Sequence, residues 1–296
     1  MRDLSAYTLT GHDSTVNCVV VTQDGRYAIS ASSDNTLKVW DLEIWEEVTT
    51  LKGHTHQVES VALTPDGRYA ISASHDNTLK VWELGQWEEV ASLEGHTHWV
   101  SSVAVTPDGR YVISASNDNT LKVWEIGTWR EVFTSKKHTV SISPVTVTPD
   151  NRYAISTVSN HVLKVWDLST WEEFITLKGH TGLITSVIVT SDSRYAISGS
   201  LDRTLRVWDL DTWGEIAALK GHTEWVVSVA VTHDSRYIIS GSIDDTLKVW
   251  EMGTWKEITT FRGHSGSVYS VTVTPDSRYV ISGSSDRTLK VWDLEV

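Results

Sequence analysis

The chain has 296 residues, of which 38 are acidic and 25 basic, so its formal net charge is −13. This charge argues against a nucleic-acid surface, which needs clustered positive side chains to displace phosphate counterions, and against binding to anionic membranes. The single cysteine, Cys18, excludes an intramolecular disulfide framework. The start of the chain has no apolar signal core, and no stretch approaches membrane-spanning length, so we expect a cytoplasmic protein.

The chain opens with a short segment, residues 6–10, that stands directly before Gly11-His12. A repeated unit then follows, and its dipeptide Val-Trp returns every 42 residues, at Trp40, Trp82, Trp124, Trp166, Trp208, Trp250 and Trp292. A period of this size is typical of repeat architectures. We therefore divide one single domain, residues 1–296, into seven units: 11–52, 53–94, 95–136, 137–178, 179–220, 221–262, and 263–296 together with 1–10.

The second unit shows the order of elements within a repeat. Runs rich in Val, Ile, Thr and Tyr cover residues 58–63, 69–72, 78–84 and 89–93, and turn residues separate them. Runs this short are typical of β-strands, and no window keeps the periodicity of a helix over a helical length. The sequence therefore predicts an all-β chain with four strands in each unit.

The two ends of the chain predict how the array closes. The seventh unit stops at Val296 and lacks its fourth strand, whereas residues 6–10 occupy the position at which other units place that strand. We expect the N-terminal strand to complete the last unit, because this pairing removes two exposed sheet edges.

Seven four-stranded units that open with Gly-His and close a strand with Trp-Asp resemble the WD-repeat β-propeller family. Trp-Asp is present in four units, and Trp-Glu replaces it in the other three. The resemblance covers essentially the whole chain and implies a seven-bladed β-propeller of four-stranded antiparallel blades. The high identity between units is similar to that of the regular arrays of bacterial WD-repeat proteins, which are often the sensing region of larger signalling proteins.

The same resemblance implies a buried structural tetrad in each blade, in which His, Asp, Ser and Trp form one hydrogen-bonded chain. Such a chain satisfies buried polar groups that would each cost about 1–3 kcal/mol if left unpaired. The tetrads expected in the seven units are His12, Ser30, Asp34 and Trp40; His54, Ser72, Asp76 and Trp82; His96, Ser114, Asp118 and Trp124; His138, Ser156, Asn160 and Trp166; His180, Ser198, Asp202 and Trp208; His222, Ser240, Asp244 and Trp250; and His264, Ser282, Asp286 and Trp292.

His, Ser and Asp are also the components of a nucleophilic triad. A catalytic site is ordinarily single, whereas this set returns along the whole chain, so we expect a scaffold role and no enzyme. His56, His75 and His98 could share one rim, yet no cluster of carboxylates or thiolates accompanies them. Solvated histidines are therefore expected rather than a zinc site, and we expect neither metal nor cofactor.

The fourth unit breaks the pattern. Lys137 replaces the loop glycine, Pro144 enters the first strand, and Asn160 replaces the tetrad aspartate. Asn160 cannot give His138 a charged acceptor, and Pro144 removes a donor from the strand ladder. Two interpretations stay open, namely tolerated drift in one copy and a pliable blade at a partner site. We expect this blade to be the least protected against amide exchange.

The residues after the loop histidine and before the tetrad aspartate vary from unit to unit. The resemblance implies that they share one rim with the entry of the innermost strand, the face on which WD-repeat proteins most often bind peptides. Large apolar side chains on such loops predict a groove for a protein or peptide partner, centred on Trp225. The candidate residues are Trp99, Leu183, Leu201, Trp225, Val227, Ile243 and Tyr269. The alternative is that they pack on one another or fill the central channel of a monomeric ring.

Six further tryptophans occupy the turn between the third and fourth strands: Trp45, Trp87, Trp129, Trp171, Trp213 and Trp255. The structural interpretation is that they lie over neighbouring blades or stack on the arginines of the adjacent turn, such as Arg26 and Arg68, in contacts worth roughly 0.5–1 kcal/mol. The alternative is a ring of equivalent aromatic sites for a repetitive small ligand such as a glycan.

Overall fold

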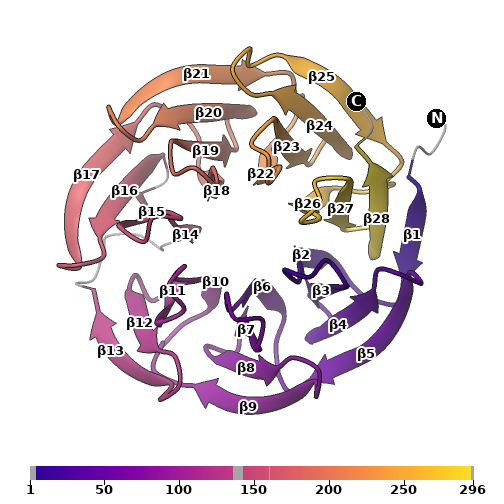
Figure 1. Ribbon diagram of the computed structural model, residues 1–296, viewed down its shortest axis with the longest axis vertical. Helices are drawn as coiled ribbons and strands as arrows, with labels where there is room; N and C mark the ends of the chain where they lie inside the picture. Colours follow the sequence, from indigo (N-terminus) through magenta and orange to yellow (C-terminus); the bar gives the residue numbers. More distant parts are fainter. Residues whose placement is uncertain (1–4, 136–142, 160, 295–296) are drawn as a thin grey trace.

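The computed structural model describes residues 5–135, 143–159 and 161–294, which form 28 β-strands. The strands make seven four-stranded antiparallel sheets, which we call blades one to seven, arranged as a closed ring (Figure 1). The predicted all-β, seven-bladed propeller is therefore confirmed. Within those three ranges no helix is long and apolar enough to cross a membrane.

Each blade follows the same order from the ring axis outward, because strands that are consecutive in the chain are neighbours in the sheet. The first strands are β2 (Val16–Val21), β6 (Val58–Leu63), β10 (Val100–Val105), β14 (Val145–Val147), β18 (Ile184–Val189), β22 (Val226–Val231) and β26 (Val268–Val273). The second strands are β3 (Tyr27–Ser32), β7 (Tyr69–Ser74), β11 (Tyr111–Ser116), β15 (Tyr153–Ser159), β19 (Tyr195–Ser200), β23 (Tyr237–Ser242) and β27 (Tyr279–Ser284). The third strands are β4 (Thr36–Asp41), β8 (Leu79–Glu83), β12 (Leu121–Glu125), β16 (Val162–Asp167), β20 (Thr204–Asp209), β24 (Thr246–Glu251) and β28 (Thr288–Asp293). The fourth strands are β5 (Glu46–Lys52), β9 (Glu88–Leu93), β13 (Arg130–Thr134), β17 (Glu172–Lys178), β21 (Gly214–Lys220), β25 (Glu257–Arg262) and, in blade seven, β1 (Tyr7–Thr10).

The N-terminal strand closes the ring, as the sequence predicts. β1 pairs antiparallel with β28, with Tyr7 opposite Val291 and Thr10 opposite Thr288 (Figure 1). Leu9 of the same strand is only 4% exposed and belongs to an apolar cluster that blade seven shares with blade one. The closure therefore buries side chains as well as pairing two backbones.

The hydrophobic core lies between the blades. One of its clusters joins Ile29, Leu37 and Val39 of blade one to Val58 and Trp82 of blade two. A blade is a sheet with two apolar faces, so it buries both faces only when it has a neighbour on each side. The stability of each blade is therefore coupled to that of its neighbours.

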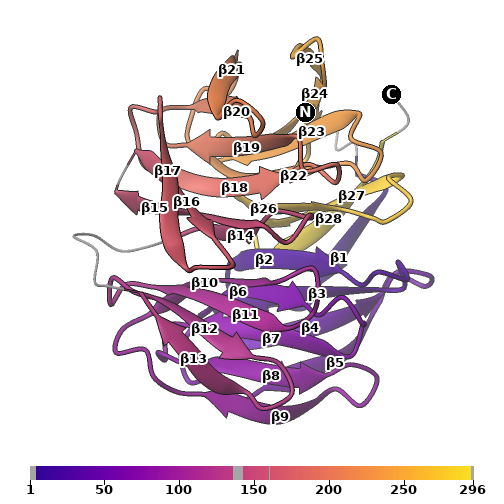
Figure 2. The same cartoon turned by 60° about the vertical axis from the view of Figure 1, so that its left-hand side comes forward.

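The antiparallel order places the connections on two opposite faces of the ring (Figure 2). The loop face carries the loops that lead from one blade to the next and the turns between second and third strands. The turn face carries the turns between first and second strands and between third and fourth strands. Backbone hydrogen bonds tie the connections of each face together, such as Ile243 N–H to the Trp225 carbonyl on the loop face and Leu42 N–H to the Arg26 carbonyl on the turn face.

Blade four has a short first strand. β14 begins directly after Pro144 and has three residues, whereas the first strands of the other six blades have six. Pro144 has no N–H to donate, so it shortens the ladder at the loop-face end of this blade. Lys137, His138 and Asn160 of the same unit lie outside the described residues.

Candidate partner-binding face

A hydrogen-bonded tetrad holds the loop face of a blade, as blade three illustrates. The Trp124 indole N–H donates to Ser114 Oγ over 2.9 Å, and Ser114 Oγ lies 2.7 Å from His96 Nε2. On its other side, His96 Nδ1 lies 2.8 Å from Asp118 Oδ2. The same contacts recur in blades one, two, five, six and seven, with distances of 2.6–2.8 Å between the histidine and the aspartate. Because a carboxylate only accepts hydrogen bonds, Nδ1 donates to the aspartate and Nε2 accepts from the serine hydroxyl.

The tetrad aspartate also binds the backbone of both loop-face connections. In blade three, Asp118 Oδ2 accepts from the Thr97 N–H over 3.0 Å, and Oδ1 accepts from the Thr120 N–H over 2.9 Å. Thr97 lies in the loop before the first strand, and Thr120 lies after the turn between the second and third strands. One carboxylate therefore fixes the two connections from which the side chains of the loop face project.

Burial and hydrogen bonding set the charges of the tetrad. Burial alone would raise the pKa of Asp118, but the hydrogen bonds that it accepts, led by that from Thr120, lower this pKa to about 2. The pKa of Asp202 is lowered to about 2 in the same way. Burial lowers the pKa of His96 and of His180, although the neighbouring carboxylate opposes this shift. Near neutral pH the aspartate is therefore charged and the histidine neutral, in agreement with the direction of the hydrogen bonds.

The serine, histidine and aspartate are connected as in a nucleophilic triad, but their surroundings do not suit one. Ser114 is 0% exposed, and so is the side chain of His96. A nucleophile must reach the reacting carbon of a substrate, whereas the Ser114 hydroxyl is enclosed and already accepts the hydrogen bond from Trp124. The arrangement therefore stabilises the loop face and offers no accessible reactive group.

Four of the seven candidate partner-binding residues are exposed: Trp225 (46%), Trp99 (44%), Leu183 (40%) and Tyr269 (40%). The other three, Leu201, Val227 and Ile243, are half-buried. In blade five the Leu201 N–H donates to the Leu183 carbonyl over 2.9 Å, and in blade six Ile243 and Trp225 are joined in the same way. Blades five, six and seven are consecutive in the ring, so the structure gathers six of the seven candidates there (Figure 1).

Trp99 stands apart from this group, in blade three. Its indole stacks on the imidazole of His75 from blade two, with ring centroids 4.2 Å apart and planes inclined by 2°, and His98 lies 5.0 Å away. His75 Nε2 is also 3.0 Å from Glu59 Oε1. One ring face of Trp99 is therefore already covered.

Among the residues that the structure describes, no group of three or more His, Cys, Asp or Glu could hold a metal ion.

The loop face of blades five to seven also carries cationic side chains, which are not among the residues predicted from the sequence. They are Arg203, Lys220, Arg262 and Arg287; all are exposed, and none forms an ion pair within the described ranges. A comparison of the units at the residue after the tetrad aspartate could have found two of them, since this residue changes from Asn in units one to three to Arg in units five and seven.

Comparison with known families gives six matches to the WD domain, G-beta repeat, at residues 4–41, 45–83, 87–125, 171–209, 213–251 and 255–293. These segments cover more than half of the chain. The chain belongs to the WD-repeat family. The longest stretch without a match, 126–170, contains most of the irregular fourth WD repeat, although its Trp166 still donates to Ser156 over 2.9 Å.

A curated protein with similarity to this WD-repeat chain is the nuclear distribution protein nudF 2 of Aspergillus clavatus. The two are 49% identical over 41 residues, which is 14% of this chain and 9% of that protein. The similarity therefore extends over about the length of one WD repeat and over less than a tenth of the relative.

The six turn-face tryptophans contact the preceding blade. Each lies edge-on to the tyrosine that begins the second strand of that blade, with centroids 5.2–6.0 Å apart and planes inclined by 80–89°. Trp45 also stacks on Tyr7, and Trp171 stacks on Phe133. All six are half-buried. They therefore connect adjacent blades at the rim of the turn face.

Of the two structural alternatives for these tryptophans, packing over the neighbouring blade is observed, and stacking on the arginines is not. Each arginine lies instead over the tyrosine that follows it in the chain, with 4.8–5.3 Å between the guanidinium carbon and the ring centroid. Each tyrosine ring thus contacts a guanidinium group and, in six blades, also a tryptophan of the next blade in an edge-on arrangement. The packing between blades explains the difference. The turn that carries each tryptophan reaches the sheet of the preceding blade, so the tryptophan contacts the tyrosine there rather than an arginine.

Neighbouring blades leave grooves between them on the turn face. A groove of about 430 Å³ between blades one and two is lined in part by Tyr27 and Trp87, and one of about 320 Å³ between blades seven and one by Trp45 and Tyr279. Each of these two grooves presents a tryptophan of the candidate ligand ring.

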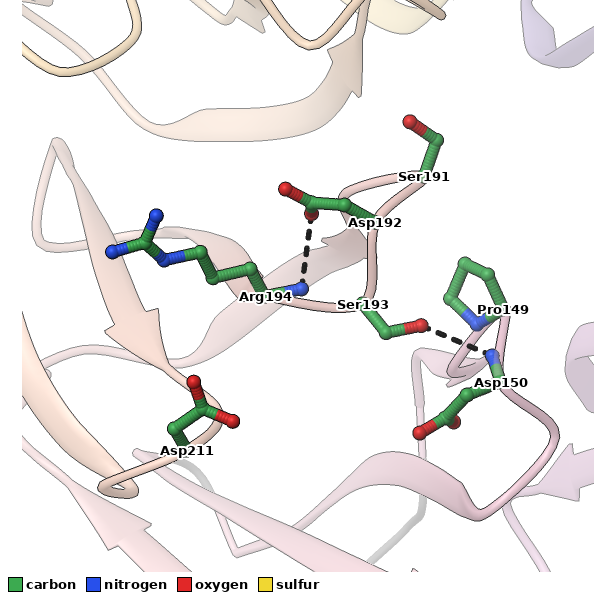
Figure 3. A pocket seen from close by; sticks show the side chains of 7 residues that line it. All are labelled: Pro149, Asp150, Ser191, Asp192, Ser193, Arg194 and Asp211. Carbon is green, nitrogen blue, oxygen red and sulfur yellow. Dashed lines mark hydrogen bonds between the residues drawn. The ribbon is translucent and has the colours of Figure 1, made fainter.

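A third groove, of about 540 Å³ between blades four and five, is polar (Figure 3). Asp150, Asp192, Arg194 and Asp211 line it together with Ser193, whose hydroxyl accepts a hydrogen bond from the Asp150 N–H over 3.0 Å. Its lining has no aromatic ring, so it differs chemically from the two grooves beside the tryptophans.

Proposed function

We propose that this WD-repeat protein is a non-catalytic interaction platform that binds a protein or peptide on the loop face of blades five to seven. WD-repeat propellers commonly act as protein-interaction scaffolds, and the buried tetrads suit a rigid frame rather than a reaction centre. The binding residues are those gathered there, with Trp225 as the central anchor.

The exposure of Trp225 carries this proposal. Trp225 is 46% exposed, although its carbonyl accepts a hydrogen bond from the Ile243 N–H at 2.9 Å. Leu183 in the preceding blade is 40% exposed, and its carbonyl accepts from the Leu201 N–H in the same way. Apolar side chains on a fixed backbone gain most when a partner covers them, because little conformational entropy is lost on binding.

Capture of partners from a cell lysate tests the proposal with two matched variants. Trp225→Asp places a charge at the proposed anchor, whereas Ile44→Asp places one at a 62% exposed apolar residue of the turn face. We expect wild type and Ile44→Asp to retain the same partners and Trp225→Asp to lose them, with equal melting temperatures. Retention of partners by Trp225→Asp would refute the proposed face. Unfolding of that variant would instead favour the alternative that Trp225 is a packing residue.

The grooves beside Trp45 and Trp87 support a second candidate function, the binding of a repetitive small ligand such as a glycan on the turn face. An aromatic ring in a groove of 320–430 Å³ suits the flat face of a sugar. Titration with oligosaccharides should then change tryptophan fluorescence in the wild type and less in Trp87→Ala. An unchanged spectrum with a broad oligosaccharide panel would leave these tryptophans a structural role only.

A further inference from the structure

We propose that the partner segment is an acidic peptide with a large apolar anchor, which lies over the loop face of blades five to seven. This inference rests on the proposed function and adds the chemistry of the partner. It is carried by the charges on the same face as Trp225, by the backbone conformation of two of the charged residues, and by the contrast with blades one and two.

Four exposed cations lie on the same face of blades five to seven as the apolar group, and the register of the blades places them there. Arg203 directly precedes Thr204, which is opposite Lys220 in the ladder of blade five. Arg262 is opposite Thr246 in blade six, and Arg287 follows the tetrad aspartate of blade seven. None of the four forms an ion pair with another described residue, so their charges are available to a partner.

Arg203 and Arg287 hold a backbone conformation that arginine disfavours. Their φ angles are 71° and 70°, in the left-handed region, where Cβ crowds the neighbouring carbonyl group. Asn35 and Asn77, with φ of 71° and 73°, occupy the same turn position in blades one and two, and asparagine tolerates this region well. Arginine at a site that favours asparagine indicates that its side chain has a use beyond the turn.

The sign of the charge on the loop face differs around the ring. Blades five to seven carry the four cations against two acidic residues, Glu224 and Asp245, once the hydrogen-bonded tetrad aspartates are set aside. Blades one and two carry one cation, Lys52, against Asp13, Glu59 and Glu94. The positive region therefore coincides with the apolar group, in a chain whose net charge is −13. Such local complementarity attracts and orients an acidic partner.

The loops beside Trp225 carry no side chain at the position of Glu224. Gly182 and Gly266 occupy it in blades five and seven, and a Cβ there would meet the Asp202 backbone nitrogen at 2.7 Å and the Ser285 hydroxyl at 2.5 Å. The two loops therefore lie close against the turns of their own blades. The loops on either side of Trp225 therefore carry no side chain at this position that would obstruct an extended peptide.

The observations favour a peptide over a nucleic acid. Four cations on the same face as an apolar group match a peptide with a few carboxylates and one hydrophobic anchor. Nucleic acids, by contrast, are bound through many phosphates by strongly basic surfaces. The acidic remainder of the ring would repel a polyanion that extends beyond blades five to seven.

Selection from a phage-displayed library of random dodecapeptides on the full chain tests the inference. Parallel selections use wild type, Trp225→Asp, the double variant Arg203→Asn with Arg287→Asn, and the control Lys52→Asn. The asparagines restore the residue type of blades one and two, so the double variant should melt at or above the temperature of the wild type. A loss of binding then cannot be due to misfolding.

We expect wild type to enrich acidic peptides that contain a large apolar residue and that Trp225→Asp does not retain. The best synthetic peptide should bind the double variant at least about tenfold more weakly and with less salt dependence, and Lys52→Asn within about twofold of wild type. Neutral or basic peptides that still require Trp225 would overturn this inference and leave the proposed function intact. Selected peptides that still bind Trp225→Asp would overturn both this inference and the proposed function, and so would a selection that enriches no peptide. Stronger binding of a single-stranded oligonucleotide at the same site would overturn the peptide assignment.

Discussion

Trp87 of blade two packs edge-on against Tyr27 of blade one, with ring centroids 5.3 Å apart and planes inclined by 80°. Trp87 adopts this position with a φ of 61°, in the left-handed region that side chains with a Cβ disfavour. The other five turn-face tryptophans have φ of 56–60°. The strain of each turn is therefore offset by aromatic packing on the preceding blade.

Replacement of Trp87 separates packing from strain. Trp87→Ala loses the contact with Tyr27 and keeps the strained φ, so we expect a destabilisation of about 1–3 kcal/mol. Trp87→Gly loses the same contact but relieves the strain, so it should be more stable than the alanine variant by about 1 kcal/mol. Urea denaturation of both variants measures the difference. An alanine variant as stable as the glycine variant would contradict the proposed balance.

The tetrads predict a loss of stability in acid in two steps. The pKa values of His96 and His180 are lowered by burial below their usual 6.5, so the unfolded chain takes up protons first as the pH falls from about 7 towards 5, and folding is weakened. The folded pKa of Asp118 and Asp202 is about 2, against a usual 3.8, so their contribution is lost as the pH falls from about 4 to 2.

Urea unfolding at a series of pH values measures both steps. Asp118→Asn should reduce the pH dependence of the lower step, because the substituted side chain does not titrate. A free energy of unfolding that stays constant or rises between about pH 7 and 5 would contradict the buried neutral histidines.

Deletion of residues 1–10 should open the ring. It removes Leu9 from the core between blades seven and one and leaves the edge of β28 unpaired, so we expect a lower melting temperature and association through the free edge. Deletion of residues 1–5 is the matched control, because it keeps β1. A monodisperse monomer with an unchanged melting temperature after the longer deletion would show that closure does not depend on this strand.

Blade four should exchange its backbone amides fastest. Its first strand has three residues, and Pro144 offers no amide at the point where the ladder would continue. Native-state hydrogen exchange, followed by peptide mass spectrometry, compares 145–159 with the equivalent segments of the other blades. Equal or greater protection of blade four would contradict this prediction.

The repeat made the architecture predictable, whereas the contacts between blades were less so. Two patterns were sufficient to predict seven four-stranded blades, namely the 42-residue spacing of tryptophans such as Trp82 and Trp124 and the strand-like runs. The short last unit was sufficient to predict closure by residues 6–10. The position of Arg68 over Tyr69 was not predictable, because it depends on where the turn of the next blade lies. The positive charge on the same face as Trp225 was also missed. A comparison of the units could have found Arg203 and Arg287, whereas Lys220 and Arg262 are placed beside them only by the strand ladders.

The proposal that the loop face of blades five to seven is the binding surface is tested most directly by a hydrogen-exchange footprint of the full chain with a selected peptide bound. We expect protection within residues 181–185, 201–204, 223–228, 243–246, 265–269 and 285–288, and none on the turn face. Protection confined to the turn-face grooves, or to the loops of blades one and two, would contradict the account.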